Sequence, residues 1–225
     1  MIVKTFFLSI FQKNTRVVVC EKTGKAVCID PGEDSPELVS FVRENGYDLQ
    51  AITLTHAHLD HIGGVGAFKK AFPDAEIILH ADDEVLYQNL PQQPLRMGLP
   101  PEQLKALGLD YDVPPPITRY WKDGEEYSVG ELVFKVLHCP GHTQGHVVFA
   151  EMKEQAVFAG DSLFAGSIGR TDLPGGNHQQ LIDSINNKIL PLGDGLTVYS
   201  GHGPDTTIGR ERQTNPFLTG MYEPG

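Results

Sequence analysis

The stretch THAHLDH, residues 55–61, places three histidines and one aspartate within seven residues. It follows the apolar run AITL, residues 51–54, and this run predicts a short β-strand buried on both faces. Side chains at the end of a strand occupy rigid positions from which they can converge on one point. The stretch therefore indicates either a histidine-rich surface loop or a metal site whose other ligands lie further along the chain.

Length and composition predict one domain over residues 1–225. With 225 residues, of which 40% are hydrophobic, the chain can bury one sizeable core. The formal net charge of -11 argues against a nucleic-acid-binding surface, because such a surface needs clustered lysine and arginine. We expect no nucleic-acid partner.

The cysteines and the apolar runs bear on the compartment. Cys20, Cys28 and Cys139 form no C-x-x-C pair, which indicates neither a disulfide framework nor a thiolate zinc finger. We interpret Cys139 as a buried structural thiol. The opening MIVKTFFLSIF is predicted to be the first strand, and no later run approaches the roughly 20 apolar residues that span a bilayer. We expect a cytoplasmic protein without a membrane partner.

Strand and helix patterns alternate along the chain. The predicted strands cover residues 2–10, 16–20, 25–30, 51–55, 75–80, 131–140, 146–152, 156–161 and 196–200. Helices are predicted from Pro36 to Gly46 with Ser35 as N-cap, from Gly64 past Phe72, and over residues 179–190. The segment from Leu90 to Pro116 is predicted to form a long loop or short helices that cover a site. Strands followed by helices in both halves predict an α/β fold with two sheets face to face and helices outside, a four-layer sandwich.

Polar clusters recur where apolar strands end. They are HAHLDH at residues 56–61, GHTQGH at 141–146, GDSLF at 160–164 and GHGP at 201–204. Imidazole and carboxylate groups are ligands of borderline-soft divalent ions. The candidate ligands are His56, His58, Asp60, His61, His142, Asp161 and His202. Seven such groups exceed the four that one tetrahedral ion needs, so the clusters indicate a metal centre.

These motifs, together with Asp30-Pro31-Gly32, resemble the metallo-β-lactamase superfamily over nearly the whole chain. The resemblance implies an αβ/βα sandwich and two divalent metal ions per chain, zinc first, with iron or manganese as alternatives. It implies that His56, His58 and His142 hold one ion, that Asp60, His61 and His202 hold the other, and that Asp161 bridges them. Water shared by two dications becomes a nucleophile near neutral pH, since its pKa falls from about 15.7. Asp60 is the implied catalytic residue that orients this water or moves its proton.

Longer flanking segments suggest a substrate class. GDSLFAGSIGRTDLPGG, residues 160–176, and GHGPDTTIGRERQTNPF, residues 201–217, are similar to short glyoxalase II-type, hydroxyacylglutathione hydrolase-like proteins. This resemblance implies a metal-dependent hydrolase of glutathione thioesters such as S-lactoylglutathione. It also implies that Arg170 pairs with a carboxylate of the glutathione conjugate. Arg210 and Arg212 are weaker candidates for the same role.

Three other functions are compatible with the same motifs. Iron-dependent persulfide dioxygenases share the fold and a GRTD-like segment, residues 169–172 here, but use one iron held by two histidines and an aspartate. A hydrolase of another ester or lactone would use the same ligands with a different pocket. A binding module that keeps metal only for structure is disfavoured, because no ligand position is lost.

The remaining histidines and Asp30 have structural interpretations. His80 and His138 lie within strand-like runs and are interpreted as core or edge residues. His146 is predicted to hydrogen-bond near the ligands rather than to bind metal, and His178 to lie at the surface. Asp30 is interpreted as a turn residue or a support for a ligand.

Overall fold

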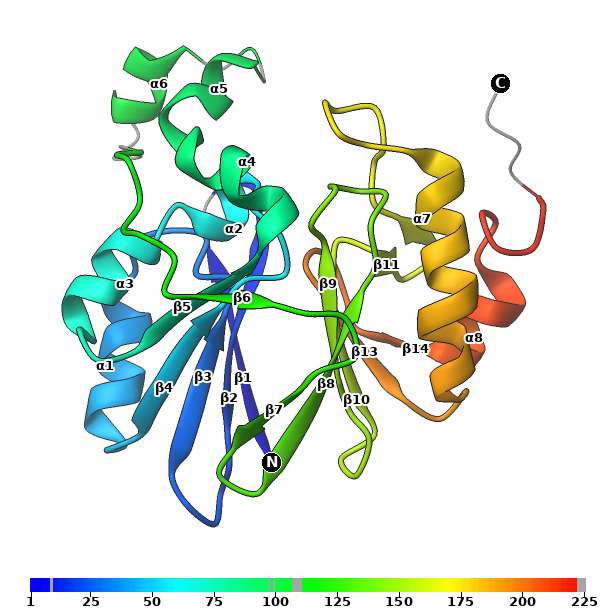
Figure 1. Cartoon of the computed structure of the whole chain (residues 1–225), viewed down its shortest axis with the longest axis horizontal. Helices are drawn as coiled ribbons and strands as arrows, with labels where there is room; N and C mark the ends of the chain where they lie inside the picture. The colour runs from blue at the N-terminus through cyan, green and yellow to red at the C-terminus, as the bar shows by residue number, and fades with distance from the viewer. Residues whose placement is uncertain (9, 97, 99, 107–110, 222–225) are drawn as a thin grey trace.

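The computed structural model describes residues 1–8, 10–96, 98, 100–106 and 111–221 (Figure 1). Two six-stranded sheets form its centre. The first has the order β1-β2-β3-β4-β5-β6 and the second the order β14-β13-β10-β9-β8-β7. A further pair, β11 and β12, forms a small sheet of its own.

The first sheet contains β1 Ile2–Leu8, β2 Lys13–Val19, β3 Lys25–Ile29, β4 Asp48–Thr53, β5 Glu76–His80 and β6 Arg119–Trp121. The second contains β7 Glu126–Val129, β8 Leu132–His138, β9 Val147–Glu151, β10 Ala156–Gly160, β13 Thr197–Ser200 and β14 Thr206–Thr207. The small pair is β11 Leu163–Phe164 and β12 Ser167–Ile168. From β3 to β6 the first sheet is parallel. In the second sheet only β10 and β13 run parallel, and the other pairs are antiparallel.

Helices cover the outer face of each sheet (Figure 1). On the outer side of the first sheet lie α1 Pro36–Glu44 and α3 Val65–Ala71, and above the end of its strands lie α2 Leu59–Ile62, α4 Glu84–Gln88, α5 Gln93–Arg96 and α6 Pro101–Ala106. The same part of the chain contains the short η1 Ala81–Asp83 and η2 Leu90–Gln92. Beside the second sheet lie α7 His178–Ser184, η3 Ile185–Ile189, η4 Leu190–Leu192 and α8 Ile208–Thr214. The predicted four-layer αβ/βα sandwich is confirmed.

Three buried clusters correspond to the three interfaces between these layers. Alternation along β2 shows how a strand serves two of them: Val17 and Val19 pack under the helices of the first layer, whereas Val18 packs between the sheets. Phe149 and Phe158 of the second sheet meet Val18 in the central cluster. The third cluster lies under α7 and α8. Strands buried on both faces therefore read as apolar runs in the sequence.

Local signals placed several helix ends correctly. Ser35 Oγ accepts a hydrogen bond from the Leu38 N–H, Pro36 is the first helical residue, and Gly46 has a φ of 66° just beyond the end of α1. The predicted helix over residues 179–190 is α7, which Asn177 caps through the Gln180 N–H, followed by η3 and η4. Short helices occupy residues 90–96 and 101–106 of the segment from Leu90 to Pro116, whereas residues 111–116 form an irregular loop. Residues 97, 99 and 107–110 lie outside the described part of the chain.

Other boundaries differ from the prediction. The strand predicted at residues 51–55 begins at Asp48 and ends at Thr53. It stops early because the Thr55 N–H donates to the Asp30 carboxylate, 2.7 Å away, instead of to a neighbouring strand. β6, β7, β14 and α8 were not predicted, since their sequences RYW, EYSV, TT and IGRERQT contain no apolar run. Among the described residues, no helix has the length and apolar character that crossing a bilayer requires.

Candidate metal centre

All seven predicted ligands gather where strands of the two sheets end. His56, His58, Asp60 and His61 follow β4, and Asp60 and His61 lie on the short helix α2. His142 follows β8, Asp161 follows β10, and His202 follows β13. Because these strands end at one side of the sandwich, residues up to 146 positions apart in the sequence meet in one place.

The first group contains His56, His58 and His142. Nδ1 of His58 lies 2.9 Å from Nε2 of His142, and that atom lies 3.2 Å from Nε2 of His56. Three imidazoles thus point ring nitrogens at one small volume. Nitrogens this close fit the separation of about 3.4 Å expected between ligands of a tetrahedral zinc ion.

The second group contains Asp60, His61 and His202. Asp60 Oδ2 lies 3.0 Å from His202 Nε2 and 3.7 Å from His61 Nε2. Asp161 lies between the two groups: Oδ1 is 3.2 Å from His61 Nε2, and Oδ2 is 3.7 Å from His142 Nε2. The structure therefore gathers the two predicted ligand sets, with the predicted bridging carboxylate in contact with both.

Two buried atoms test whether this site fits metal ions. Among the described residues, His61 Nε2 and Asp161 Oδ1 are buried without any hydrogen-bond partner. Leaving a buried polar atom unpaired costs about 1–3 kcal/mol. An imidazole lone pair and a carboxylate oxygen facing one another are donors that a dication would satisfy, so the residues fit the predicted ions.

Hydrogen bonds orient three of the imidazoles. Nδ1 of His142 donates to the Arg170 carbonyl at 2.7 Å, and Nδ1 of His202 donates to the Phe11 carbonyl at 3.1 Å. Nδ1 of His61 lies 2.9 Å from the Asp30 carboxylate. With Nδ1 as donor, Nε2 of each ring can present a lone pair to an ion, and His61 does so once the ion displaces its second proton.

Asp30 holds the His61 ring of the second group in place. Both of its oxygens accept from Thr55, through the backbone N–H and the hydroxyl at 2.7 Å each. The Lys13 ammonium lies 3.6 Å away, and both side chains are 1% exposed. Burial alone would raise the pKa of Asp30, but Lys13 and His61 hold it below its ordinary value. The interpretation of Asp30 as a ligand support is borne out by these contacts.

Electrostatics of the ligands also favour cations. Burial and the Lys13 charge oppose protonation of His61, yet the nearby carboxylates of Asp161, Asp60 and Asp30 raise its pKa to about 9. Burial would raise the pKa of Asp60, but His61 and His202 lower it to about 2. A group of carboxylates that attracts a proton this strongly also attracts a dication, and binding the ion releases the proton.

Asp83 links the loop that carries His56 and His58 to the loop that carries His142. Sequence analysis did not identify this residue. Its buried carboxylate accepts from the Thr143 hydroxyl at 2.8 Å and from the backbone N–H groups of Ala57 and Gly145 at 3.1 and 2.7 Å. Burial raises the pKa of Asp83. Because Ala57 lies between His56 and His58, and Thr143 follows His142, Asp83 fixes the spacing of the three histidines.

Gln93, on α5, holds the same loop from the other side. Its Nε2 donates to the Ala57 carbonyl at 2.8 Å, and its Oε1 accepts from the Leu59 N–H at 2.9 Å. Gln93 is 4% exposed. The segment expected to cover the site thus contributes a buried contact to the ligand loop.

The other histidines mostly follow the sequence interpretation. His146 accepts from the Asp161 N–H at 3.1 Å and lies 3.1 Å from Ser162 Oγ, so both of its nitrogens are engaged and it positions Asp161. His178 is partly exposed at the start of α7. His80 and His138 end strands β5 and β8, as expected.

A pocket of about 370 Å³ opens over five of the candidate ligands. Besides ligands, it is lined by Phe164, Ser167, Ile168, Arg170 and Leu173. The Arg170 guanidinium makes two hydrogen bonds to Asp172, at 2.8 and 2.7 Å. Arg170 therefore lies at the pocket as predicted, with its charge already paired, whereas Arg210 and Arg212 do not line it. Cys139 is fully buried, and burial raises its pKa to about 12.

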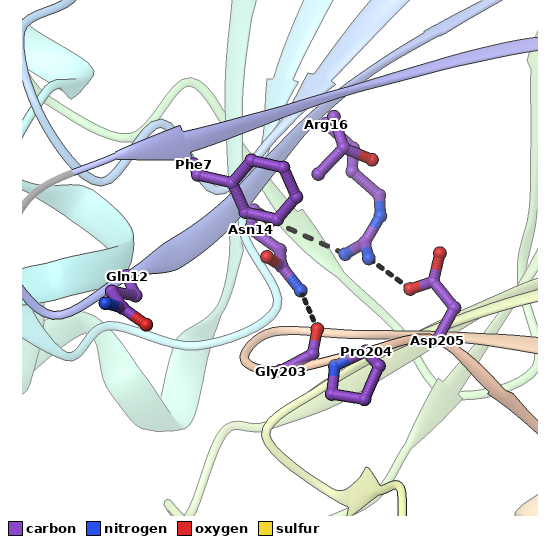
Figure 2. Close-up of a pocket in the computed structure, with 8 residues that line it drawn as sticks. Phe7, Gln12, Asn14, Arg16, Gly203, Pro204 and Asp205 are labelled. Carbon is purple, nitrogen blue, oxygen red and sulfur yellow. Dashed lines mark hydrogen bonds and ion pairs between the residues drawn. The ribbon is translucent and has the colours of Figure 1, made fainter.

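The loop after His202 is anchored to β2, beside a separate pocket of about 340 Å³ (Figure 2). Asn14 donates to the Gly203 carbonyl at 2.8 Å, and Arg16 pairs with Asp205. On the other side of His202, Gly201 packs against Asp161: a Cβ atom at this position would lie 2.1 Å from Asp161 Oδ1. Only glycine leaves room there for the carboxylate between the two ligand groups.

Comparisons with known proteins agree with this geometry. The sequence model of the metallo-beta-lactamase superfamily matches residues 11–202. The hydroxyacylglutathione hydrolase GloC of Haemophilus influenzae is 38% identical over 92% of this chain and 93% of its own length. The crystal structure of the BLEG-1 B3 metallo-beta-lactamase matches with a TM-score of 0.84 at 37% identity, covering 97% of this chain and all of that one. The structure of TTHA1623 in a di-iron-bound form matches with a TM-score of 0.82 at 38% identity over 96% of this chain and 100% of its own.

Proposed function

The chain belongs to the metallo-β-lactamase superfamily, and from this premise we propose that it is a binuclear metallo-hydrolase that cleaves glutathione thioesters of the S-lactoylglutathione type. The observation that carries the proposal is the convergence of two complete ligand groups on a shared Asp161 at the floor of one pocket. The similarity to a hydroxyacylglutathione hydrolase supports the substrate class.

The proposed ligands divide as the structure groups them. His56, His58 and His142 would hold one ion, Asp60, His61 and His202 the other, and Asp161 would contact both. Bound dications supply an activated water near neutral pH and polarise the carbonyl of the substrate. Zinc is our first choice, with iron or manganese as alternatives, because imidazole and carboxylate ligands accept all three.

Asp60 has the position that a proton-handling residue needs. Its Oδ2 lies 3.0 Å from His202 Nε2, and the side chain lines the pocket. Its pKa of about 2 keeps it ionised, so it can accept a hydrogen bond from the attacking water and hold that water in line with the substrate. Little general-acid assistance is needed for departure, since a thiolate is a good leaving group.

Arg170 is the proposed contact for a carboxylate of the glutathione moiety. Arg170 lines the same pocket as Phe164, Ile168 and Leu173, whose apolar side chains would contact the acyl group. In this structure the Arg170 guanidinium makes a bidentate contact with the Asp172 carboxylate. The carboxylate of the substrate would replace Asp172 in the same bidentate geometry. Replacing Arg170 by Gln should raise KM more than it lowers kcat.

The second ligand group favours the hydrolase over the dioxygenase alternative. A centre that needs only one iron, two histidines and one aspartate gives no role to an additional Asp60, His61 and His202 set. The test is to assay one metal-loaded sample with S-lactoylglutathione and with glutathione persulfide. Thioester turnover with two bound ions supports the proposal. Oxygen uptake with glutathione persulfide, at one iron per chain and without thioester turnover, would replace it with the dioxygenase.

A further inference from the structure

A second cluster of metal-ligand side chains lies outside the centre. His80 ends β5, Asp82 lies in η1, and His138 ends β8. Asp82 Oδ2 is 3.6 Å from His80 Nδ1 and 4.0 Å from His138 Nε2, and one ligand atom from each residue lies within 4.8 Å of the others. None of these residues belongs to the centre described above.

We propose that His80, Asp82 and His138 bind one divalent transition-metal ion, of the Zn²⁺ class, at a site separate from the catalytic centre. Ligand atoms of a tetrahedral zinc ion lie about 3.4 Å apart, so the present separations of 3.6 and 4.0 Å from Asp82 would have to shorten slightly. Two imidazoles and one carboxylate suit such an ion, with water in the remaining position. This inference does not depend on the proposed hydrolase activity.

The imidazole rings of His80 and His138 must rotate before both can bind one ion. Their rings are stacked, with centroids 4.1 Å apart and planes inclined by 11°. A small rotation of each ring would aim the lone pairs at one point between them. Asp82 is 56% exposed and free to follow. His138 Nε2 now donates to the Gln144 carbonyl at 2.8 Å, so coordination through Nε2 would replace that hydrogen bond and move the proton to Nδ1.

The charge around the cluster favours a cation. His80 Nδ1 accepts a hydrogen bond from the Asp82 N–H at 3.3 Å, so this nitrogen carries a lone pair on the side of Asp82. Asp123 adds a second carboxylate beside the cluster, where it accepts from the His138 N–H and pairs with Lys188.

An ion at this site would link the two sheets next to the metal centre. β5 belongs to the first sheet and β8 to the second. Asp82 is adjacent to Asp83, whose carboxylate holds the loops of the first ligand group. Because only the folded protein would bind this ion, its stability would increase as the metal concentration rises.

The test is a zinc titration of protein whose main centre has first been loaded and freed of excess metal. Calorimetry and elemental analysis should find one further ion per chain. Asp82→Asn should lower the affinity for this ion roughly ten- to hundred-fold. The double variant His80→Ala/His138→Ala should not bind it. His178→Ala, a histidine substitution outside both clusters, should bind as wild type does.

Two results would overturn the proposal: no further ion in the wild-type protein, or a further ion whose affinity is unchanged in Asp82→Asn. Because Asp82 is exposed, its substitution leaves folding intact and keeps the test informative even where the double variant does not fold. Circular dichroism of each variant checks this point. A rise in Tm with added zinc that disappears in Asp82→Asn is the matching stability readout.

Discussion

Replacing Asp30 by Asn should destabilise the protein far more than its conservative size suggests. The carboxylate faces the buried Lys13 ammonium at 3.6 Å and accepts from Thr55 and His61. An amide keeps one acceptor oxygen but turns an NH₂ group toward other donors and leaves the charge of Lys13 unpaired. Breaking a buried pair by removing one partner costs about 3–5 kcal/mol.

Urea denaturation of metal-free protein measures this loss without a contribution from bound ions. Asp34→Asn is the matched control, because it removes the same charge from an exposed side chain four residues away. The free energy of unfolding should fall by about 3–5 kcal/mol in Asp30→Asn and by less than about 0.5 kcal/mol in Asp34→Asn. Equal values for the two variants would refute the role given to the buried pair.

The same substitution has a defined pH dependence. The pKa of Asp30 is lower in the folded protein than its ordinary value of 3.8, so its contribution is present above that pH and is lost as pH falls through the folded value. The difference in stability between wild type and Asp30→Asn should therefore shrink on acidification.

Asp30→Asn should also lower the metal affinity by about ten- to hundred-fold, since Asp30 orients His61. Competition with a chelator measures this affinity.

Three further predictions concern the site. Asp60→Asn should abolish most thioester turnover while the far-UV circular dichroism stays unchanged; turnover like that of wild type would remove its proton-handling role. Gly201→Ala places a Cβ 2.1 Å from Asp161 Oδ1, so elemental analysis should find fewer than two ions per chain, and full occupancy would contradict this packing. Cys139 has its pKa raised to about 12 by burial, so iodoacetamide at about pH 8 should leave it unmodified until urea unfolds the chain, as peptide mass spectrometry can show.

The convergence of the seven candidate ligands could be predicted from the sequence because each lies in a short motif after an apolar strand. His56 and His142 are separated by 86 positions, yet each is fixed by its own strand end, so local patterns were sufficient. The four-layer fold followed in the same way from strands buried on both faces. Motif and fold agree here because the strands themselves place the ligands.

The supports of the site were not predictable from local patterns. Asp83 follows a strand like many turn residues, and only the approach of β5 to the loops around Ala57 and Thr143 gives its carboxylate three donors. Gln93 lies in a segment without periodicity, and its contact depends on how α5 packs. Tertiary contacts of this kind leave no signal in a short window of sequence.

The most direct test of the central claim measures metal content and thioester turnover on the same sample. Elemental analysis of protein purified without added metal, followed by an assay with S-lactoylglutathione, should give about two ions per chain at the centre and turnover that a chelator removes and metal restores. The further ion proposed at His80, Asp82 and His138 is subtracted by repeating the analysis on Asp82→Asn. Two ions at the centre without thioester turnover would contradict the substrate class, and fewer than two with full turnover would contradict the binuclear centre.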